Sequence, residues 1–175
     1  MKLRLARPLR RLAEGFLLAV VAMALIAGCR AQATSVVGWV ETVRLPGIDA
    51  AIAAKMDTGA TTASINADIL QQPDSETESG GMIRFKFKDD DGHEAIYERP
   101  IVRWVKIKDG DGGFFRRPVV QMRFCVAGQW LEAEVNLADR EQFNYAILVG
   151  RNMLKQGGLT VSSAETYLTA PRCSH

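Results

Sequence analysis

Beyond Val36 the chain consists of brief β-rich runs separated by turn signals, and this pattern restricts the fold more than any other feature. Glycine, proline and aspartate cluster between the runs, for example at 45–47 and 89–92. One short helix is predicted over residues 151–156, where two glycines follow. Because the chain has no amphipathic helix of ordinary length, we predict an all-β barrel or sandwich. The predicted strands cover residues 39–44, 52–56, 64–66, 83–88, 101–107, 114–124, 129–136 and 146–149.

The first residues have the layout of a bacterial export signal. A leader with five Lys and Arg residues precedes an apolar stretch over residues 16–27, which is too short to span a bilayer comfortably. The stretch ends at Ile26-Ala27-Gly28-Cys29, which resembles the lipobox, where small residues precede a cysteine that becomes lipidated. An uncleaved membrane anchor and an ordinary small-residue cleavage site are the alternatives.

This segment predicts a lipoprotein signal peptide over residues 1–28, a tether over 29–36 and a single domain over 37–175. Lipid on Cys29 would hold the domain on a membrane surface through burial of its methylene groups. Arg30, rather than Asp, follows the cysteine, and by resemblance to lipoprotein sorting this favours the outer membrane. We therefore expect a lipid-anchored protein on the periplasmic side of the cell envelope.

The charge of the chain excludes one class of partner. The whole chain has 22 basic and 20 acidic residues, but the signal peptide holds five of the basic residues and one of the acidic ones. The remaining chain therefore has 17 basic and 19 acidic residues, a formal net charge of −2. Nucleic-acid binding has no electrostatic support.

Two cysteines remain if Cys29 carries lipid. An oxidising compartment permits Cys125 and Cys173 to form a disulfide without requiring one. The sequence does not show that their Cα atoms come close enough, so a bridge and two free thiols both stay open.

The segment most informative about chemistry is Asp57-Thr58-Gly59-Ala60, which follows an apolar strand. The strand carries the Asp57 carboxylate inward, and Gly59 permits a tight turn and close backbone approach to a substrate. The Thr58 hydroxyl can hydrogen-bond within the loop. Alone the triplet is weak evidence, because Asp-Thr-Gly is also good turn chemistry.

A second segment strengthens the interpretation. The apolar run at 146–149 leads into Gly150-Arg151-Asn152 and the predicted helix. Together the two segments resemble the retroviral aspartic proteases, or retropepsins, which pair Asp-Thr-Gly-Ala with a later apolar strand, Gly-Arg-Asn/Asp and a C-terminal helix. The chain is also similar over residues 38–161 to bacterial retropepsin-like peptidases, long labelled ATP-dependent zinc proteases. The matching residues are Leu45-Pro46, 54–60, 117–120, Asp139-Arg140 and 148–151.

This resemblance implies a closed β-barrel with one short C-terminal helix. It implies that Asp57 is catalytic, that Thr58, Gly59 and Ala60 complete the active-site loop, and that Gly150, Arg151 and Asn152 support it. The chemistry needs two aspartates facing one water. Because the chain has one such triplet, the second carboxylate would come from an identical subunit in a twofold homodimer.

The chain departs from the retropepsin pattern at Thr61. Retropepsins usually have a carboxylate four residues after the catalytic Asp, where it meets the Arg of Gly-Arg-Asn/Asp, so Arg151 needs another partner here. Ala60 lacks the hydroxyl that other aspartic peptidases often have at this position, which predicts a pH optimum less acidic than that of gastric-type enzymes. A hairpin over 103–119, with glycines at its tip, is the expected flap; a surface hairpin with no role in catalysis is the alternative.

The zinc and ATP of the older label do not fit the residues. His93-Glu94-Ala95-Ile96-Tyr97 begins like the zinc motif His-Glu-x-x-His, but Tyr97 takes the place of the second ligand. The chain has no Gly-rich loop followed by Gly-Lys-Ser/Thr that would bind phosphates. We expect no metal and no cofactor, and we interpret His93 as a turn residue.

These observations predict an aspartic endopeptidase that hydrolyses peptide bonds of cell-envelope proteins or peptides, using an Asp57 carboxylate pair and an activated water. The alternative is a non-catalytic envelope binding or scaffold lipoprotein that retains the fold. A third idea, association with ATP-grasp amino-acid ligases, comes from the family resemblance alone.

Overall fold

The computed structural model describes residues 34–74, 80–108 and 112–174. The predicted signal peptide, Cys29 and the tether up to residue 33 lie outside the described residues, as do positions 109–111 of the predicted flap tip. In the described part of the chain, no helix combines the length and the hydropathy needed to cross a membrane.

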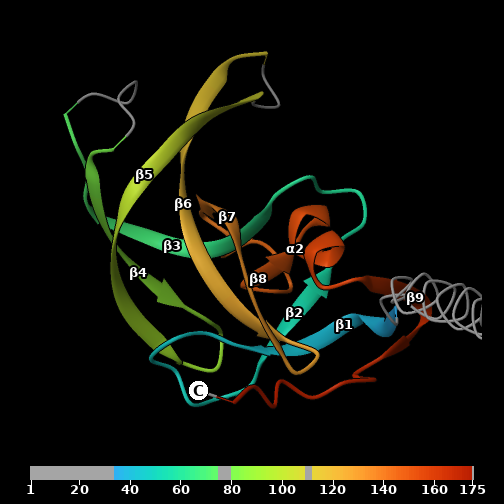
Figure 1. Ribbon diagram of the computed structural model, residues 1–175. Helices are drawn as coiled ribbons and strands as arrows, with labels where there is room; N and C mark the ends of the chain where they lie inside the picture. The colour runs from blue at the N-terminus through green and yellow to red at the C-terminus, as the bar shows by residue number, and fades with distance from the viewer. Residues whose placement is uncertain (1–33, 75–79, 109–111, 175) are drawn as a thin grey trace, which may run out of the picture. The chain divides into compact units, whose positions relative to one another are not determined.

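The described residues form a single sheet of nine strands and one short helix (Figure 1). The strand order is β4-β5-β6-β7-β3-β8-β2-β1-β9. Further pairings of β1 with β6 and of β3 with β4 fold this sheet back on itself. The elements are β1 (Ser35–Arg44), β2 (Ile52–Met56), β3 (Ala63–Gln71), β4 (Met82–Lys88), β5 (Glu94–Lys108), β6 (Phe114–Val126), β7 (Gln129–Ala138), β8 (Ile147–Val149), α2 (Arg151–Gln156) and β9 (Leu159–Thr166).

The mostly-β architecture with one short helix confirms the coarse prediction, and the bounds of β2 and α2 are as predicted. The predicted tether was too long, because Ser35 and Val36 already pair with β9. Strand β9 was missed, since its residues are mostly exposed and polar and show no alternation. The first half of β5 was also missed: the predicted strand began at residue 101, whereas β5 begins at Glu94 and includes Pro100, which lies opposite Met82 within the ladder.

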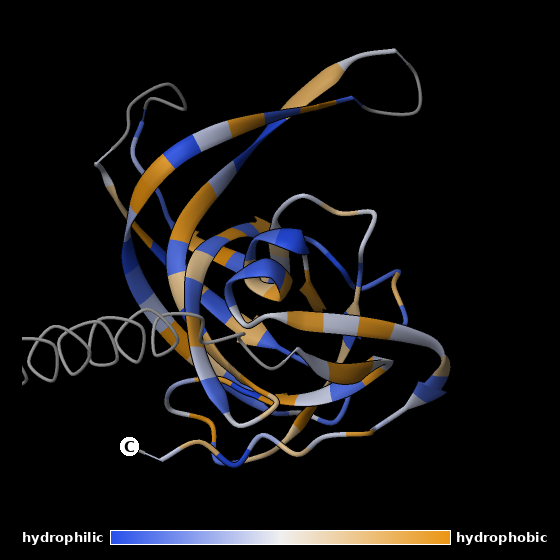
Figure 2. Cartoon of the chain, turned by 45° about the vertical axis from the view of Figure 1, so that its right-hand side comes forward, coloured by the Kyte–Doolittle hydropathy of each residue, from blue (hydrophilic) through white to orange (hydrophobic). Residues whose placement is uncertain are grey.

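Alternation along the strands builds the core (Figure 2). In β4, Ile83, Phe85 and Phe87 are fully buried while their neighbours are exposed or half-buried. Side chains with a period of two lie on one face of a strand, so these three residues point to the same interior. Ile65 of β3 and Phe124 of β6 belong to the same buried cluster.

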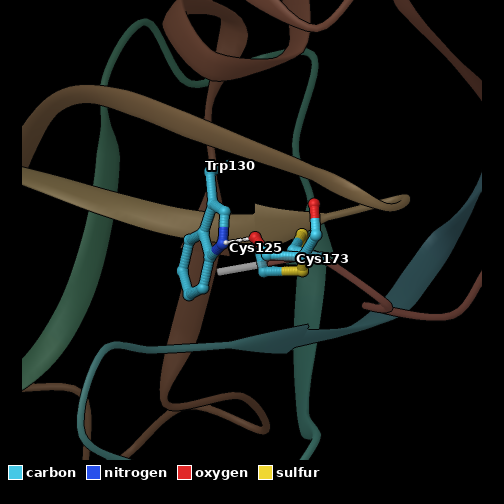
Figure 3. Close-up of a disulfide and its surroundings, with 4 residues drawn as sticks. Cys125, Trp130 and Cys173 are labelled. Atoms are coloured by element: carbon cyan, nitrogen blue, oxygen red, sulfur yellow. Dashed lines mark hydrogen bonds between the residues drawn. A yellow bond between two sulfur atoms is a disulfide. The ribbon is translucent and has the colours of Figure 1, made fainter.

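The C-terminal segment is fastened to the sheet at both of its ends. A disulfide joins Cys125 of β6 to Cys173, with their Cα atoms 6.0 Å apart, so the bridge is present (Figure 3). Trp130 lies opposite Cys125 on β7 and its Nε1–H donates to the Ser174 carbonyl at 3.0 Å. The fully buried Glu41 carboxylate accepts three backbone N–H bonds, two of which come from residues 168 and 169.

Candidate active site

Asp57 follows the last residue of β2, where three strands meet. Strand β8 lies between β2 and β3, parallel to β2 and antiparallel to β3. The Asp57 backbone N–H donates to the Val149 carbonyl of β8 at 2.9 Å, which extends the ladder by one residue. The side chain of Asp57 is 21% exposed, so it is partly buried but within reach of a ligand.

The loop after Asp57 turns back on the carboxylate. The backbone N–H groups of Gly59 and Ala60 donate to Oδ1 of Asp57 at 2.8 and 3.1 Å. A Cβ at Gly59 would lie 3.1 Å from that oxygen, tighter than ordinary contacts, so a side chain at this position would displace the carboxylate. Thr58 enters the network through its carbonyl oxygen, which accepts from Arg151, and not through the hydroxyl that the sequence suggested.

Arg151 clamps this loop from the first turn of α2. Its Nη1 donates to the carbonyls of Thr58 and Gly59 at 2.9 and 3.0 Å, and its Nη2 donates to Oγ1 of Thr61 at 2.9 Å. A hydroxyl therefore takes the place of the usual carboxylate, and two carbonyl oxygens complete the set. The partner of Arg151 that the sequence left undetermined is thus the loop that follows Asp57.

Gly150 and Asn152 fix the strand-to-helix turn against the other end of the same loop. A Cβ at Gly150 would lie 2.6 Å from the Thr62 carbonyl carbon, so the two backbones approach too closely for any side chain. Asn152 accepts from the Ala63 N–H at 3.0 Å and donates to the Glu134 carbonyl at 2.7 Å. The structure therefore brings together all seven residues predicted for the loop and its support, Gly150 through close backbone packing and the others through hydrogen bonds.

Lys55 is a site residue that the sequence reasoning missed. Its Nζ donates to Oδ2 of Asp57 at 3.0 Å, and its own side chain is 44% exposed. Lys55 and Asp57 are two residues apart along an extended chain, so their side chains share a face, and this spacing was the available signal.

The charge state of Asp57 follows from these contacts. Burial raises the pKa of the carboxyl, but the Lys55 ammonium and the N–H groups of Gly59 and Ala60 outweigh it and hold the pKa below the ordinary aspartate value. Lys55 thus favours the ionised form of Asp57, whereas the missing hydroxyl at Ala60 was expected to disfavour it. The less acidic pH optimum stays a prediction.

Asp57 opens into a cavity of about 350 Å³. Asp57 is the one acidic side chain among the described residues that line it. Arg140 lies in the wall and is held by the Tyr145 carbonyl and the Ser64 hydroxyl. Burial and the charge of Arg117 lower the pKa of Arg140, while Asp57 raises it.

A second cavity of about 490 Å³ shares Gln142 and Phe143 with the first, so the two cavities are neighbours and are together called the cleft. The β5–β6 hairpin supplies one wall of this second cavity, through Trp104 and residues 115–118. The far ends of β5 and β6 rise away from the other strands (Figure 1). This places the predicted flap hairpin beside the cleft; closure over a substrate stays a prediction.

Asp89, Asp91 and His93 could together offer three metal-ligand atoms. Asp89 already accepts from the His93 ring and from the His93 backbone N–H, both at 2.8 Å. These bonds close the turn between β4 and β5, so the turn role predicted for His93 is confirmed.

Comparisons with known proteins agree with this geometry. The family model described as "Retropepsin-like aspartic endopeptidase RimB" (RimB-like) matches residues 36–171. A crystal structure of Lpg0085, a protein of unknown function (DUF785) from Legionella pneumophila, is 28% identical, with a TM-score of 0.65. The match covers 79% of this chain and 100% of the Legionella chain. No curated protein matches the chain.

Proposed function

The chain belongs to the RimB-like family of retropepsin-like aspartic endopeptidases, and on this premise we propose that it hydrolyses peptide bonds with Asp57 as a catalytic carboxylate. The observation that carries the proposal is the Asp57 loop, in which two backbone N–H groups hold Oδ1 while Oδ2 accepts from Lys55, and both side chains line the cavity. The loop is fastened by Arg151 from the far side. A carboxylate fixed in this way is pre-oriented for catalysis.

Peptide hydrolysis by an aspartic peptidase needs a second carboxyl group opposite the first. One carboxylate takes the proton of the attacking water, and the other, protonated, polarises the scissile carbonyl. Two carboxylates at such close range share one proton and titrate as a pair. Asp57 would be the base or the acid according to which member of the pair holds the proton.

We propose that the second carboxyl is Asp57 of another copy of this chain. The absence of a further acidic side chain among the described residues of the Asp57 cavity supports this assignment. A twofold axis through the site would bring the two loops together. Each loop would be carried by the closed barrel that we propose, which the β1–β6 and β3–β4 pairings support.

The place of action is proposed from the N-terminal segment. A lipid on Cys29 would restrict the enzyme to membrane-bound or periplasmic protein and peptide substrates. Metabolic labelling with a radioactive fatty acid tests this directly, because label should enter the full chain and not the Cys29→Ser variant.

A non-catalytic binding protein is the second candidate. The ion pair between Lys55 and Oδ2 of Asp57 favours it, since this bond occupies the oxygen that a catalytic water would use. The two candidates differ in whether peptide bonds are broken.

The deciding experiment incubates the soluble domain with an envelope protein extract and follows new peptides by mass spectrometry. The wild type should generate cleavage products that are missing with Asp57→Asn. Asp49→Asn is the matched control, because this exposed carboxylate does not line the cleft. Identical peptide patterns for the wild type and Asp57→Asn would favour the binding protein.

A further inference from the structure

We propose that Arg140 is a catalytic residue whose guanidinium donates a hydrogen bond to the carbonyl oxygen of the peptide bond being cleaved. The negative charge that develops on this oxygen is then stabilised by a buried cation as well as by the carboxyl pair. The inference rests on the proposed peptidase function and adds a residue to the machinery of the same site.

Arg140 is a buried cation that has no ion pair. It is 8% exposed, and within the described part of the chain no other Lys or Arg is buried. Among the described residues no carboxylate oxygen lies within 4.0 Å of its side-chain nitrogens. Burying a charge without a partner is costly, so a group of this kind in a cleft is a candidate for a functional role.

One side of the Arg140 side chain is held firmly by its neighbours. Nε donates to the Tyr145 carbonyl at 3.0 Å, and Nη1 donates to the Ser64 hydroxyl at 3.1 Å. The backbone N–H of Arg140 donates to Oδ1 of Asn66 at 2.8 Å, and Cζ lies 4.7 Å from the centroid of the Phe143 ring. A donor fixed in this way does not have to reorganise when charge develops beside it.

The other side of the guanidinium is open to the Asp57 cavity. A guanidinium has five N–H donors, and the bonds from Nε and Nη1 use only two of them. Nη2 donates to no acceptor among the described residues, yet it is not one of their buried side-chain atoms without a partner. Because Arg140 lines the cavity of about 350 Å³, we infer that Nη2 faces the space that a substrate would fill.

Asp57 borders the same space. Its carboxylate lies in the wall of the cavity, and its charge raises the pKa of Arg140 against the effect of burial. The two groups therefore act on one another across the cavity. A peptide group whose carbonyl carbon faces a water on Asp57 would have its carbonyl oxygen turned towards Arg140.

The role of Arg140 follows from the first step of hydrolysis. The water oxygen bonds to the carbonyl carbon, and the proton of the water passes to the ionised carboxylate of the pair. The electron pair of the C=O double bond moves onto the carbonyl oxygen, which takes the proton of the other carboxyl. Arg140 donates a hydrogen bond to this oxygen and keeps its own proton. Its effect grows with the charge on the oxygen, so it lowers the barrier more than it strengthens substrate binding.

Steady-state kinetics of the full chain in detergent micelles test this role, with one peptide that the wild type cleaves as substrate. Arg140→Gln removes the charge and should lower kcat about a hundredfold with KM nearly unchanged. Arg140→Lys keeps the charge as a single point and should lose less. Arg123→Gln is the matched control, because this exposed arginine stacks on Trp130 outside the cleft, and it should leave both constants unchanged.

Chemical rescue separates a catalytic from a structural role. Arg140→Ala leaves room for a free guanidinium ion, so millimolar guanidinium should restore part of the lost kcat in this variant and should not raise kcat in the wild type or in Asp57→Asn. An arginine that only supports the fold would lower the melting temperature without giving this response. Thermal melts identify any variant that fails to fold, and if Arg140→Ala does, the comparison of Arg140→Lys with Arg140→Gln decides.

The same measurements separate this inference from the proposed function. A folded Arg140→Gln with the kcat of the wild type leaves the peptidase standing and overturns the role of Arg140. A loss confined to KM, or a folded Arg140→Ala that guanidinium does not restore, overturns it as well. Absence of cleavage by the wild type removes the peptidase and the role of Arg140 together.

Discussion

The disulfide between Cys125 and Cys173 should be a major source of stability for the domain. The bridge closes a loop with a sequence separation of 48 residues and fastens the C-terminal segment to β6. The perturbation is Cys173→Ser, which spares the fully buried Cys125 and so avoids placing a hydroxyl in the core.

The magnitude follows from the length of the loop. Cross-linking two points removes conformational freedom from the unfolded chain, and for a separation of 48 residues the chain-entropy relation gives about 4 kcal/mol at 25 °C. The Trp130–Ser174 bond and the Glu41 contacts hold the segment in the folded state of either protein. The loss should therefore appear as a larger entropy of the unfolded state, without rearrangement of the fold.

Urea unfolding of the soluble domain at equilibrium, followed by tryptophan fluorescence, measures the effect. Cys173→Ser should lower the free energy of unfolding by about 4 kcal/mol, and wild type under reducing conditions should show the same loss. A difference of less than about 1 kcal/mol would refute the reasoning. So would a thiol titration of the denatured, unreduced domain that finds both cysteines free.

Three further outcomes are expected. Arg151→Ala should lower kcat on a cleaved peptide by about a hundredfold, because a misplaced catalytic loop costs that much. Thr61→Val removes one of the three hydrogen bonds of Arg151 and should lower kcat less. Equal kcat for Arg151→Ala and wild type would contradict the role of Arg151 in holding the loop. Lys55→Gln should raise the pKa of Asp57 in a carbon NMR titration. Because the pKa of Asp57 is lower in the folded wild type than in the unfolded chain, its carboxylate stabilises the fold at pH values above the unfolded pKa. This stabilisation is lost as the pH falls through the folded pKa, and Lys55→Gln should make the loss smaller. An unchanged Asp57 titration in the variant would show that the ion pair has no effect. Glu41→Ala should lower the free energy of unfolding by about 3 kcal/mol in urea, because it leaves one buried and two partly buried N–H groups without an acceptor. A loss below about 1 kcal/mol would contradict this role.

The Asp57 loop could be predicted from sequence because its parts are local. Asp57-Thr58-Gly59 and Gly150-Arg151-Asn152 each have a backbone requirement that few other residues satisfy, as the close approach at Gly150 illustrates. Their meeting in space follows from the parallel pairing of β2 with β8. The partners of Arg151 could not be predicted, because two of them are carbonyl oxygens, which every residue has.

Other features depend on distances that a sequence does not encode. The Cys125–Cys173 bridge was left open because it requires two segments 48 residues apart to come within 6.0 Å. The Lys55–Asp57 contact depends on a side-chain rotamer as well as on spacing. Strand β9 is stabilised by its parallel partner β1, and its own residues carry little β signal.

Subunit mixing tests the central claim, that peptide hydrolysis needs an Asp57 carboxylate from each of two chains. Wild type and Asp57→Asn are mixed at constant total protein, allowed to exchange subunits, and assayed on a peptide that the wild type cleaves. If both carboxylates are needed, activity should follow the square of the wild-type fraction and fall to about a quarter of its full value at equal mixing. A linear decline to about half would show that each chain acts with its own Asp57 alone and would contradict the account.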